Sequence, residues 1–250
     1  DYSLNNLNNN FTEQKDIKLF VMGKNSWEEF DRVAFEKPKE KTLYLGSKKG
    51  ANSLNGDGGL DEKIETGLPN DTFTCNPLDP VPTFGGALFH FYKDLNGVRD
   101  QSQIEQRTDV LVYSTPVLEE KMKIAGKVKV DLFVSSGGKN ADFTAKLVEV
   151  KPDGYAKIIT EGIFRMVHPG GKELIPGKIY QIEIDLGYTA IEIPKGNIVR
   201  LEISGSNFPK YNRNPNTTTD PLYATEFIPA KQTVYLGSNY PSKIVIGVAN

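Results

Sequence analysis

The stretch IYQIEIDL, residues 179–186, alternates strictly between apolar and polar side chains. Its apolar members are Tyr180, Ile182, Ile184 and Leu186, and its polar members are Gln181, Glu183 and Asp185. Successive side chains of a β-strand point to opposite faces, so this period of two predicts an antiparallel strand with one face buried and one face in water. The stretch therefore places the chain in the all-β class.

The same alternation recurs in KVKVDLFV (127–134) and NIVRLEISGS (197–206). The predicted inward side chains are Val128, Val130, Leu132, Val134, Val199, Leu201 and Ile203, and the second stretch places Arg200, Glu202 and Ser204 on the solvated face. Further strand candidates are IKLFVMG, KTLYLGS, DVLVYST, DFTAKLVEV, AKIITEGIFRMV, QTVYLGS and KIVIGVA. Turn signals such as PDG and PKGN separate them, which predicts a β-sandwich or jelly roll. Short helices are expected only within 26–35 and 101–107.

The composition of the chain argues against nucleic-acid binding and against a membrane span. The chain has 250 residues, and 30 Lys and Arg against 32 Asp and Glu give a net charge of −2. With no long basic run, binding to nucleic acid through a phosphate-neutralising patch is not expected. No apolar run reaches 18 residues, so no membrane span is expected. The single cysteine and the absence of signal-peptide features at the start of the sequence predict a cytoplasmic protein.

The sequence offers little material for catalysis. It has one cysteine, Cys75, two isolated histidines, His90 and His168, and no G-x-S-x-G motif. Two histidines and one cysteine at these spacings do not make a zinc site, and NGDGGLDE (55–62) lacks the last glutamate of an EF-hand loop. We therefore predict no catalytic residue, no metal and no cofactor in this chain.

Two loops are unusual. FGGALFHFY (84–92) is too apolar for an exposed loop, so either the core of this chain or a partner must cover it. SGSNFPKYNRNPNTTTDP (204–221) is rich in amide and aromatic side chains, which either support the loop internally or form a sugar-binding surface. The candidate ligand-loop residues are Asn207, Phe208, Tyr211, Arg213 and Asn214.

Several segments resemble one known family, in order along the chain. They include LFVMGKNSWEE, DTFTCNPLDPVPTFGG, DFTAKLVEVKPDG and SNFPKYNRNPN, of which the last two are the most specific. They are similar to the C-terminal β domain of the family that joins cocaine esterase, α-amino-acid ester hydrolases, glutaryl acylases and X-Pro dipeptidyl peptidases (the CocE/NonD family). The resemblance implies a jelly-roll β-sandwich of the galactose-binding-like type over residues 17–250. It also implies that residues 1–16 are the remnant of a linker or helix from an α/β-hydrolase domain that lies before this one.

In this family the Ser-His-Asp triad lies in the preceding domain, and no residue of this chain matches it. The resemblance implies that the segment around Leu88 and Phe89 reaches that domain and walls the acyl part of its substrate pocket. The expected partner is thus the upstream hydrolase domain of the same protein, and a homo-oligomer is expected if that domain is absent. The alternative is a separate carbohydrate-binding module that uses the 207–214 loop.

Overall fold

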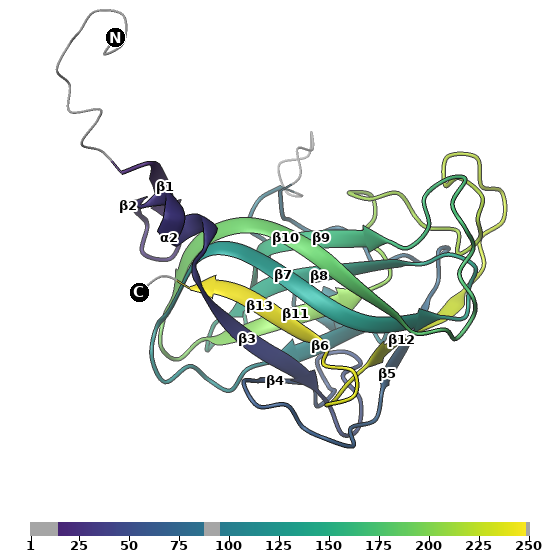
Figure 1. Ribbon diagram of the computed structural model, residues 1–250, viewed down its shortest axis with the longest axis horizontal. Helices are drawn as coiled ribbons and strands as arrows, with labels where there is room; N and C mark the ends of the chain where they lie inside the picture. The colour runs from purple at the N-terminus through teal and green to yellow at the C-terminus, as the bar shows by residue number, and fades with distance from the viewer. Residues whose placement is uncertain (1–14, 88–95, 249–250) are drawn as a thin grey trace, which may run out of the picture.

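The computed structural model describes residues 15–87 and 96–248, apart from the side chains of residues 33 and 34. It is an all-β sandwich with a small hairpin at its N-terminal end (Figure 1). The strands are β1 Ile17–Val21, β2 Ser26–Phe30, β3 Lys39–Gly46, β4 Gly59–Asp61, β5 Asp71–Cys75, β6 Val110–Ser114, β7 Met122–Ser136, β8 Asp142–Val150, β9 Ala156–Arg165, β10 Tyr180–Ile193, β11 Ile198–Ser204, β12 Ala230–Tyr235 and β13 Lys243–Val248.

Eleven of these strands belong to one hydrogen-bonded sheet. Its order is β5-β12-β7-β13-β3-β4-β6-β11-β8-β9, and β10 lies off this path, paired antiparallel with β7. The two halves of the sheet are joined through β4, which pairs with β6 in parallel at one position, Gly59 with Ser114. The Thr160 hydroxyl of β9 donates to the Leu186 carbonyl of β10 at 2.6 Å, which brings the far ends of the two layers together. This gives the predicted sandwich, whereas the jelly-roll strand order stays a prediction.

The core lies between the two layers, where the alternating patterns predicted it. All seven predicted inward residues of 127–134 and 197–206 are completely buried, as is Ile184 of β10. The polar members of 179–186 are exposed. The period of two therefore identified both faces of β10 correctly, although Tyr180 at its start is only half-buried.

The predicted solvated face of β11 is buried, which corrects the sequence analysis. Arg200, Glu202 and Ser204 are 7%, 3% and 4% exposed. Every residue of the neighbouring strand β8 is buried as well. The reason is that residues 76–108, described here at 76–87 and 96–108 and called the covering segment below, pack over this side of the sheet. Their apolar contacts join Val81 and Ile104 to Val110 and Val112 of β6.

The helix predicted within 26–35 is wrong over its first half. Residues 26–30 form β2, which pairs with β1 from Ser26↔Val21 to Phe30↔Ile17. Only α2, Arg32–Glu36, follows as a helix. In 101–107 the helix is a single 3₁₀ turn, η3, Ile104–Gln106. Exposure alternates along β2, with Trp27 and Glu29 exposed and their neighbours half-buried, as in a strand. The two glutamates of SWEEF have high helix propensity, which obscured this pattern in the sequence.

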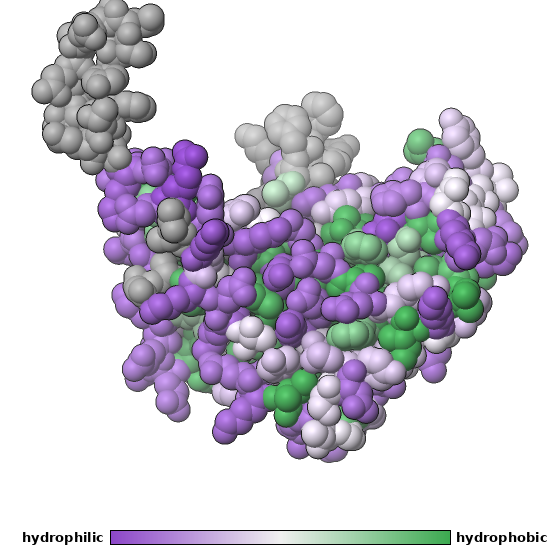
Figure 2. All heavy atoms as spheres, viewed as in Figure 1, coloured by the Kyte–Doolittle hydropathy of each residue, from purple (hydrophilic) through white to green (hydrophobic). Residues whose placement is uncertain are grey.

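Hydrophilic residues cover most of the face seen in Figure 2, with apolar residues in scattered groups, as is ordinary for a folded domain. Within residues 15–87 and 96–248, no helix is long and apolar enough to cross a membrane.

The core assignment predicts a large effect for Leu201→Ala. Leu201 is fully buried between the layers, so the shortened side chain leaves a cavity. We expect the free energy of unfolding in urea, followed by circular dichroism, to fall by about 3 kcal/mol. Val117→Ala, at a side chain that is 56% exposed, is the control and should change it by less than about 0.5 kcal/mol. A loss below about 1 kcal/mol for Leu201→Ala would contradict the assignment.

Candidate functional site at the base of the 84–97 segment

The structure brings together the two loops that the sequence analysis singled out. The Thr83 amide donates to the Phe208 carbonyl at 2.6 Å, and the Phe208 amide donates to the Val81 carbonyl at 2.9 Å. The Val81 amide also donates to the Ser206 hydroxyl at 2.8 Å, across a separation of 125 residues in sequence. The apolar loop and the amide-rich loop therefore meet at one site.

Glycines close the base of the 84–97 segment. Gly86 and Gly97 exchange backbone hydrogen bonds of 2.7 and 3.1 Å, which hold the two ends of the segment side by side. Gly86 has a φ of +86°, and a Cβ there would lie 1.9 Å from a carboxylate oxygen of Glu161. Only glycine fits both the left-handed backbone and this close approach.

Leu88 and Phe89 lie outside the described residues, as does His90. Their predicted role at a pocket wall is therefore not tested by the structure. The described chain reaches Ala87, which is exposed, and resumes at Asn96 beside Gly97.

Glu161 connects the two loops through a buried ion pair. Its side chain is 2% exposed, and one carboxylate oxygen accepts from Lys210 Nζ at 2.5 Å. The other oxygen accepts from Asn207 Nδ2 at 2.5 Å. Burial, and next the charge of Glu161, raise the pKa of Tyr211 to about 12, so this phenol remains protonated. Glu161 therefore links the two loops, because it contacts Gly86 and binds Asn207 and Lys210.

A second set of buried polar groups extends inward from the same base. Gln101 Nε2 donates to the Phe84 carbonyl at 2.6 Å, and Gln101 Oε1 accepts from Lys146 Nζ at 2.9 Å. Lys146 lies 3.7 Å from the Glu202 carboxylate, and both side chains are 3% exposed. Arg200 pairs with Glu105 of η3 at 2.6 Å. These are the charges that the covering segment encloses.

Glu105 and Glu202 are both buried carboxyl groups, 0% and 3% exposed. Burial raises the pKa of Glu202 to about 8, since Lys146 offsets the desolvation only in part and the neighbouring Glu105 adds to it. Burial raises the pKa of Glu105 as well, against the opposing charge of Arg200. At neutral pH the folded protein therefore keeps a proton here that an unfolded glutamate releases.

The candidate ligand loop turns its polar groups inward. Asn214 Nδ2 donates to Asp142 at 2.7 Å, and Asp142 also accepts two bonds from Arg165, at 3.0 and 2.7 Å. The Arg213 guanidinium lies over the rings of Phe208 and Phe227, at 5.4 and 4.5 Å from their centres. It also donates to the Pro77 carbonyl at 3.1 Å. These contacts give the loop internal support, the first of the two interpretations of its sequence.

The remaining sequence candidates show no reactive arrangement. Cys75 is buried in β5, and burial raises the pKa of its thiol to about 12, so it stays uncharged. His168 lies in an exposed turn. In the NGDGG turn, the Asp57 carboxylate accepts from the backbone amides of Lys48, Lys49 and Gly50. Over the described parts of the chain, no cluster of three or more His, Cys, Asp or Glu side chains is placed to hold a metal ion.

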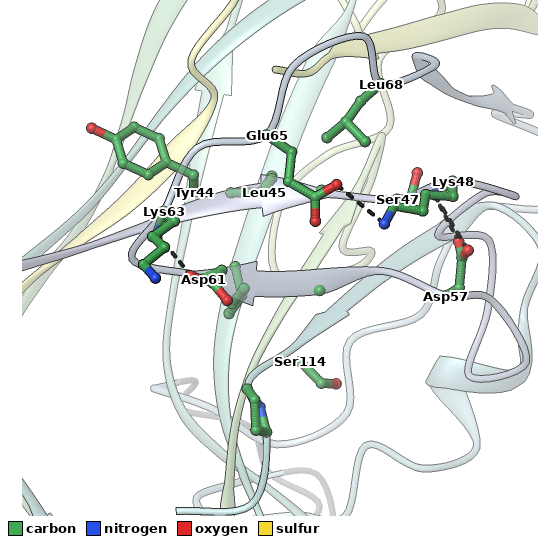
Figure 3. A pocket seen from close by; sticks show the side chains of 14 residues that line it. Tyr44, Leu45, Ser47, Lys48, Asp57, Asp61, Lys63, Glu65, Leu68 and Ser114 are labelled. Atoms are coloured by element: carbon green, nitrogen blue, oxygen red, sulfur yellow. Dashed lines mark hydrogen bonds and ion pairs between the residues drawn. The ribbon is translucent and has the colours of Figure 1, made fainter. Parts of the chain in front are cut away.

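A pocket of about 310 Å³ opens elsewhere, between β3, β4 and the end of β6 (Figure 3). Its rim carries an ion pair of Lys48 with Glu65 at 3.3 Å. None of the residues that line this pocket belongs to 84–97 or 204–221. This pocket is therefore separate from the two loops.

The fold and this site define a β-sandwich domain in which Gly86 and Gly97 pair at the base of the 84–97 segment. The family model of the X-Pro dipeptidyl-peptidase C-terminal non-catalytic domain matches residues 9–245, and the chain belongs to this family.

The relatives that this chain matches are longer proteins. It is 38% identical over 240 residues to cocaine esterase from Rhodococcus sp. (strain MB1 Bresler), covering 93% of this chain and 41% of that protein. An aminopeptidase from a marine sediment Thaumarchaeota archaeon is similar in structure, with a TM-score of 0.82 and 25% identity over 95% of this chain and 41% of its own. An α-amino acid ester hydrolase shares the fold, with a TM-score of 0.81 and 24% identity. The match covers 93% of this chain and 41% of the chain of that hydrolase. The chain thus spans about two fifths of the length of the relatives it matches.

The close approach at Gly86 predicts a strong effect for Gly86→Ala. The new methyl group meets Glu161, whereas Gly154, with a nearly identical φ of +88°, has no atom within 4 Å of the place that a Cβ would take. Gly154→Ala is therefore the matched control for backbone strain alone, which costs about 1 kcal/mol. We expect Gly86→Ala to lower the free energy of unfolding by at least about 2 kcal/mol more than the control. Equal losses for the two variants would contradict the packing described.

The retained proton predicts a pH-dependent stability. The folded pKa of Glu202 lies above the unfolded value, so the native state binds more protons and stability falls as pH rises from about 5 to about 8. The slope should approach about 1 kcal/mol per pH unit and should be smaller in Glu202→Gln. Urea unfolding across this pH window measures it, with Glu183→Gln, at an exposed surface pair, as the control. Parallel slopes for the wild type and Glu202→Gln would refute the raised pKa of Glu202.

Proposed function

We propose that this chain is the C-terminal part of a larger serine acyl hydrolase, in which it packs on a preceding α/β-hydrolase domain and completes the wall of its substrate pocket. The parent cleaves an ester or amide bond, or removes X-Pro dipeptides, through an acyl-enzyme formed in that domain. The family assignment and the 41% coverage of the relatives support this role. The chain's own contribution is binding and positioning, with no step of the chemistry.

The observation that carries the proposal is the fixed base of the 84–97 segment. The Gly86–Gly97 pair, the Glu161 ion pair and the Gln101 bridge hold its two ends on a sheet whose charges are buried. The two ends of the segment are thus held at a defined place on the sheet, and residues that line a pocket need such fixed positioning. Leu88 and Phe89 are the apolar residues proposed to contact the acyl group.

Two observations favour this role over a carbohydrate-binding module: the relatives include an esterase, and the side-chain nitrogens of Asn207 and Asn214 donate to carboxylates within the protein. We also propose the domain bounds, the location and the oligomeric state of this chain. Residues 1–16 form the connection to the hydrolase domain and 17–250 the sandwich. The protein is cytoplasmic, in keeping with its single, buried cysteine. The chain by itself forms a homo-oligomer through the surfaces that the hydrolase domain covers.

Hydrolysis of acyl esters, measured for this chain alone and after mixing with the hydrolase part proposed to precede it, tests the role. We expect no turnover from this chain alone, and turnover by the hydrolase part that is raised on mixing by at least about tenfold, the loss that a misplaced pocket wall costs. Turnover by this chain alone, or a hydrolase part whose activity is indifferent to it, would sink the proposal.

Within the intact hydrolase, Leu88→Ala and Phe89→Ala test the pocket wall. Each removes apolar contact with the acyl group, so we expect kcat/KM for acyl esters to fall about tenfold. Leu54→Ala, at an exposed side chain between β3 and β4, is the matched control and should leave kcat/KM unchanged. Wild-type kcat/KM in both pocket-wall variants would remove these residues from the site.

A further inference from the structure

The hairpin of β1 and β2 exposes a pair of aromatic rings. Phe20 and Trp27 are cross-strand partners, and their rings meet edge to face with centres 5.8 Å apart. Phe20 is 43% exposed and Trp27 is 65% exposed. Trp27 is the only tryptophan of the chain. Large aromatic side chains left in water at one place on a rigid support are typical of interaction surfaces.

The hairpin is firmly attached to the sandwich by its other face. The Met22 amide donates to the Ala190 carbonyl at 3.0 Å, and the Glu192 amide donates to the Met22 carbonyl at 2.9 Å. Gly23 lies so close to Glu192 that a Cβ would come within 2.1 Å of its carbonyl oxygen. Val21 is fully buried. The inner face of the ribbon is therefore occupied, and the outer face with Phe20 and Trp27 is the one left to water.

Ion pairs border the two rings. Lys18 and Glu29, the next cross-strand pair on the outer face, lie 3.5 Å apart. On the inner side, Glu28 accepts from Lys24 and from Lys123 of β7. The charges of both signs are paired among themselves, so the surface is an apolar centre with a neutralised polar rim. This is the composition of a protein-binding patch and not of an anion or cation site.

From this arrangement we infer that the outer face of the β1–β2 hairpin, centred on Phe20 and Trp27, is the docking surface for the hydrolase domain that precedes this chain. The inference rests on the proposed function. It goes beyond it by naming the surface, which lies apart from the 84–97 segment.

Chain connectivity supports this occupant over any other. The family is a C-terminal one, so the larger part of its relatives, which this chain does not cover, precedes it. The family match begins at residue 9, and the stretch from there to β1 at Ile17 reaches at most about 30 Å when extended. A domain tethered so closely is present at high effective concentration beside the hairpin. Figure 1 shows that the hairpin projects from one end of the sandwich, so a domain joined there can contact it.

The single tryptophan makes the test direct. We would label this chain with 5-fluorotryptophan, which gives one ¹⁹F resonance from Trp27, and titrate it with the unlabelled hydrolase part. The resonance should show the solvent-isotope shift of an exposed ring in the free chain, and should move and lose that shift on binding. By calorimetry, Trp27→Ala should weaken the association at least about tenfold, and Trp27→Phe about threefold. Tyr223→Ala, which removes a ring that is 78% exposed at a distant loop, should leave it unchanged.

The outcomes separate the surface from the proposed function. Association that leaves the ¹⁹F resonance unmoved and is equal for Trp27→Ala would overturn the docking surface and leave the accessory role standing. Absence of association for every variant would overturn both. A resonance that moves with the concentration of this chain alone, and that the hydrolase part does not displace, assigns the surface to a second copy, and one already shielded in the dilute free chain shows that the chain covers it itself. Both of these results also overturn the inference. Circular dichroism of each variant confirms that the sandwich is intact.

Discussion

The charges buried on the outer face of β8 and β11 are the constraint on which the functional end of this domain depends. Lys146, Arg200 and Glu202 point away from the core and would be ordinary surface residues if the covering segment were absent. Enclosed, they are tolerated only because Gln101 and Glu105 of that segment pair with them. These pairings hold the covering segment on the sheet, and its position fixes where the chain departs at Ala87.

The two sequence loops share this support. Glu161 contacts Gly86 on one side and binds Lys210 and Asn207 on the other. The amide-rich loop therefore supports the base of the apolar one. This explains why a loop with so many polar side chains offers few of them to a ligand. Its chemistry is used to hold the neighbouring segment in place, which is the contribution expected of a non-catalytic domain that completes a site in another.

The sequence was most informative where burial and alternation coincide, as in β7 and β10, whose inward faces were predicted residue by residue. It was misleading for β11, because a polar face covered by a charged segment has the same alternation as a polar face in water. The pairing of β2 with β1 was hidden for a related reason, since SWEEF has helical propensity and only the tertiary contact makes it a strand. The meeting of Thr83 with Phe208 is a long-range contact for which the sequence holds no local signal.

In the intact hydrolase, the partner domain is proposed to lie against one side of the sandwich, across the hairpin and the base of the 84–97 segment. Hydrogen–deuterium exchange of this chain, free and joined to the hydrolase domain, tests that placement most directly. We predict slower exchange on joining for peptides spanning residues 17–30 and 84–99, with no change for β12, which pairs with β5 and β7. Slower exchange confined to the region of β3 and β4, or no change anywhere, would contradict this placement.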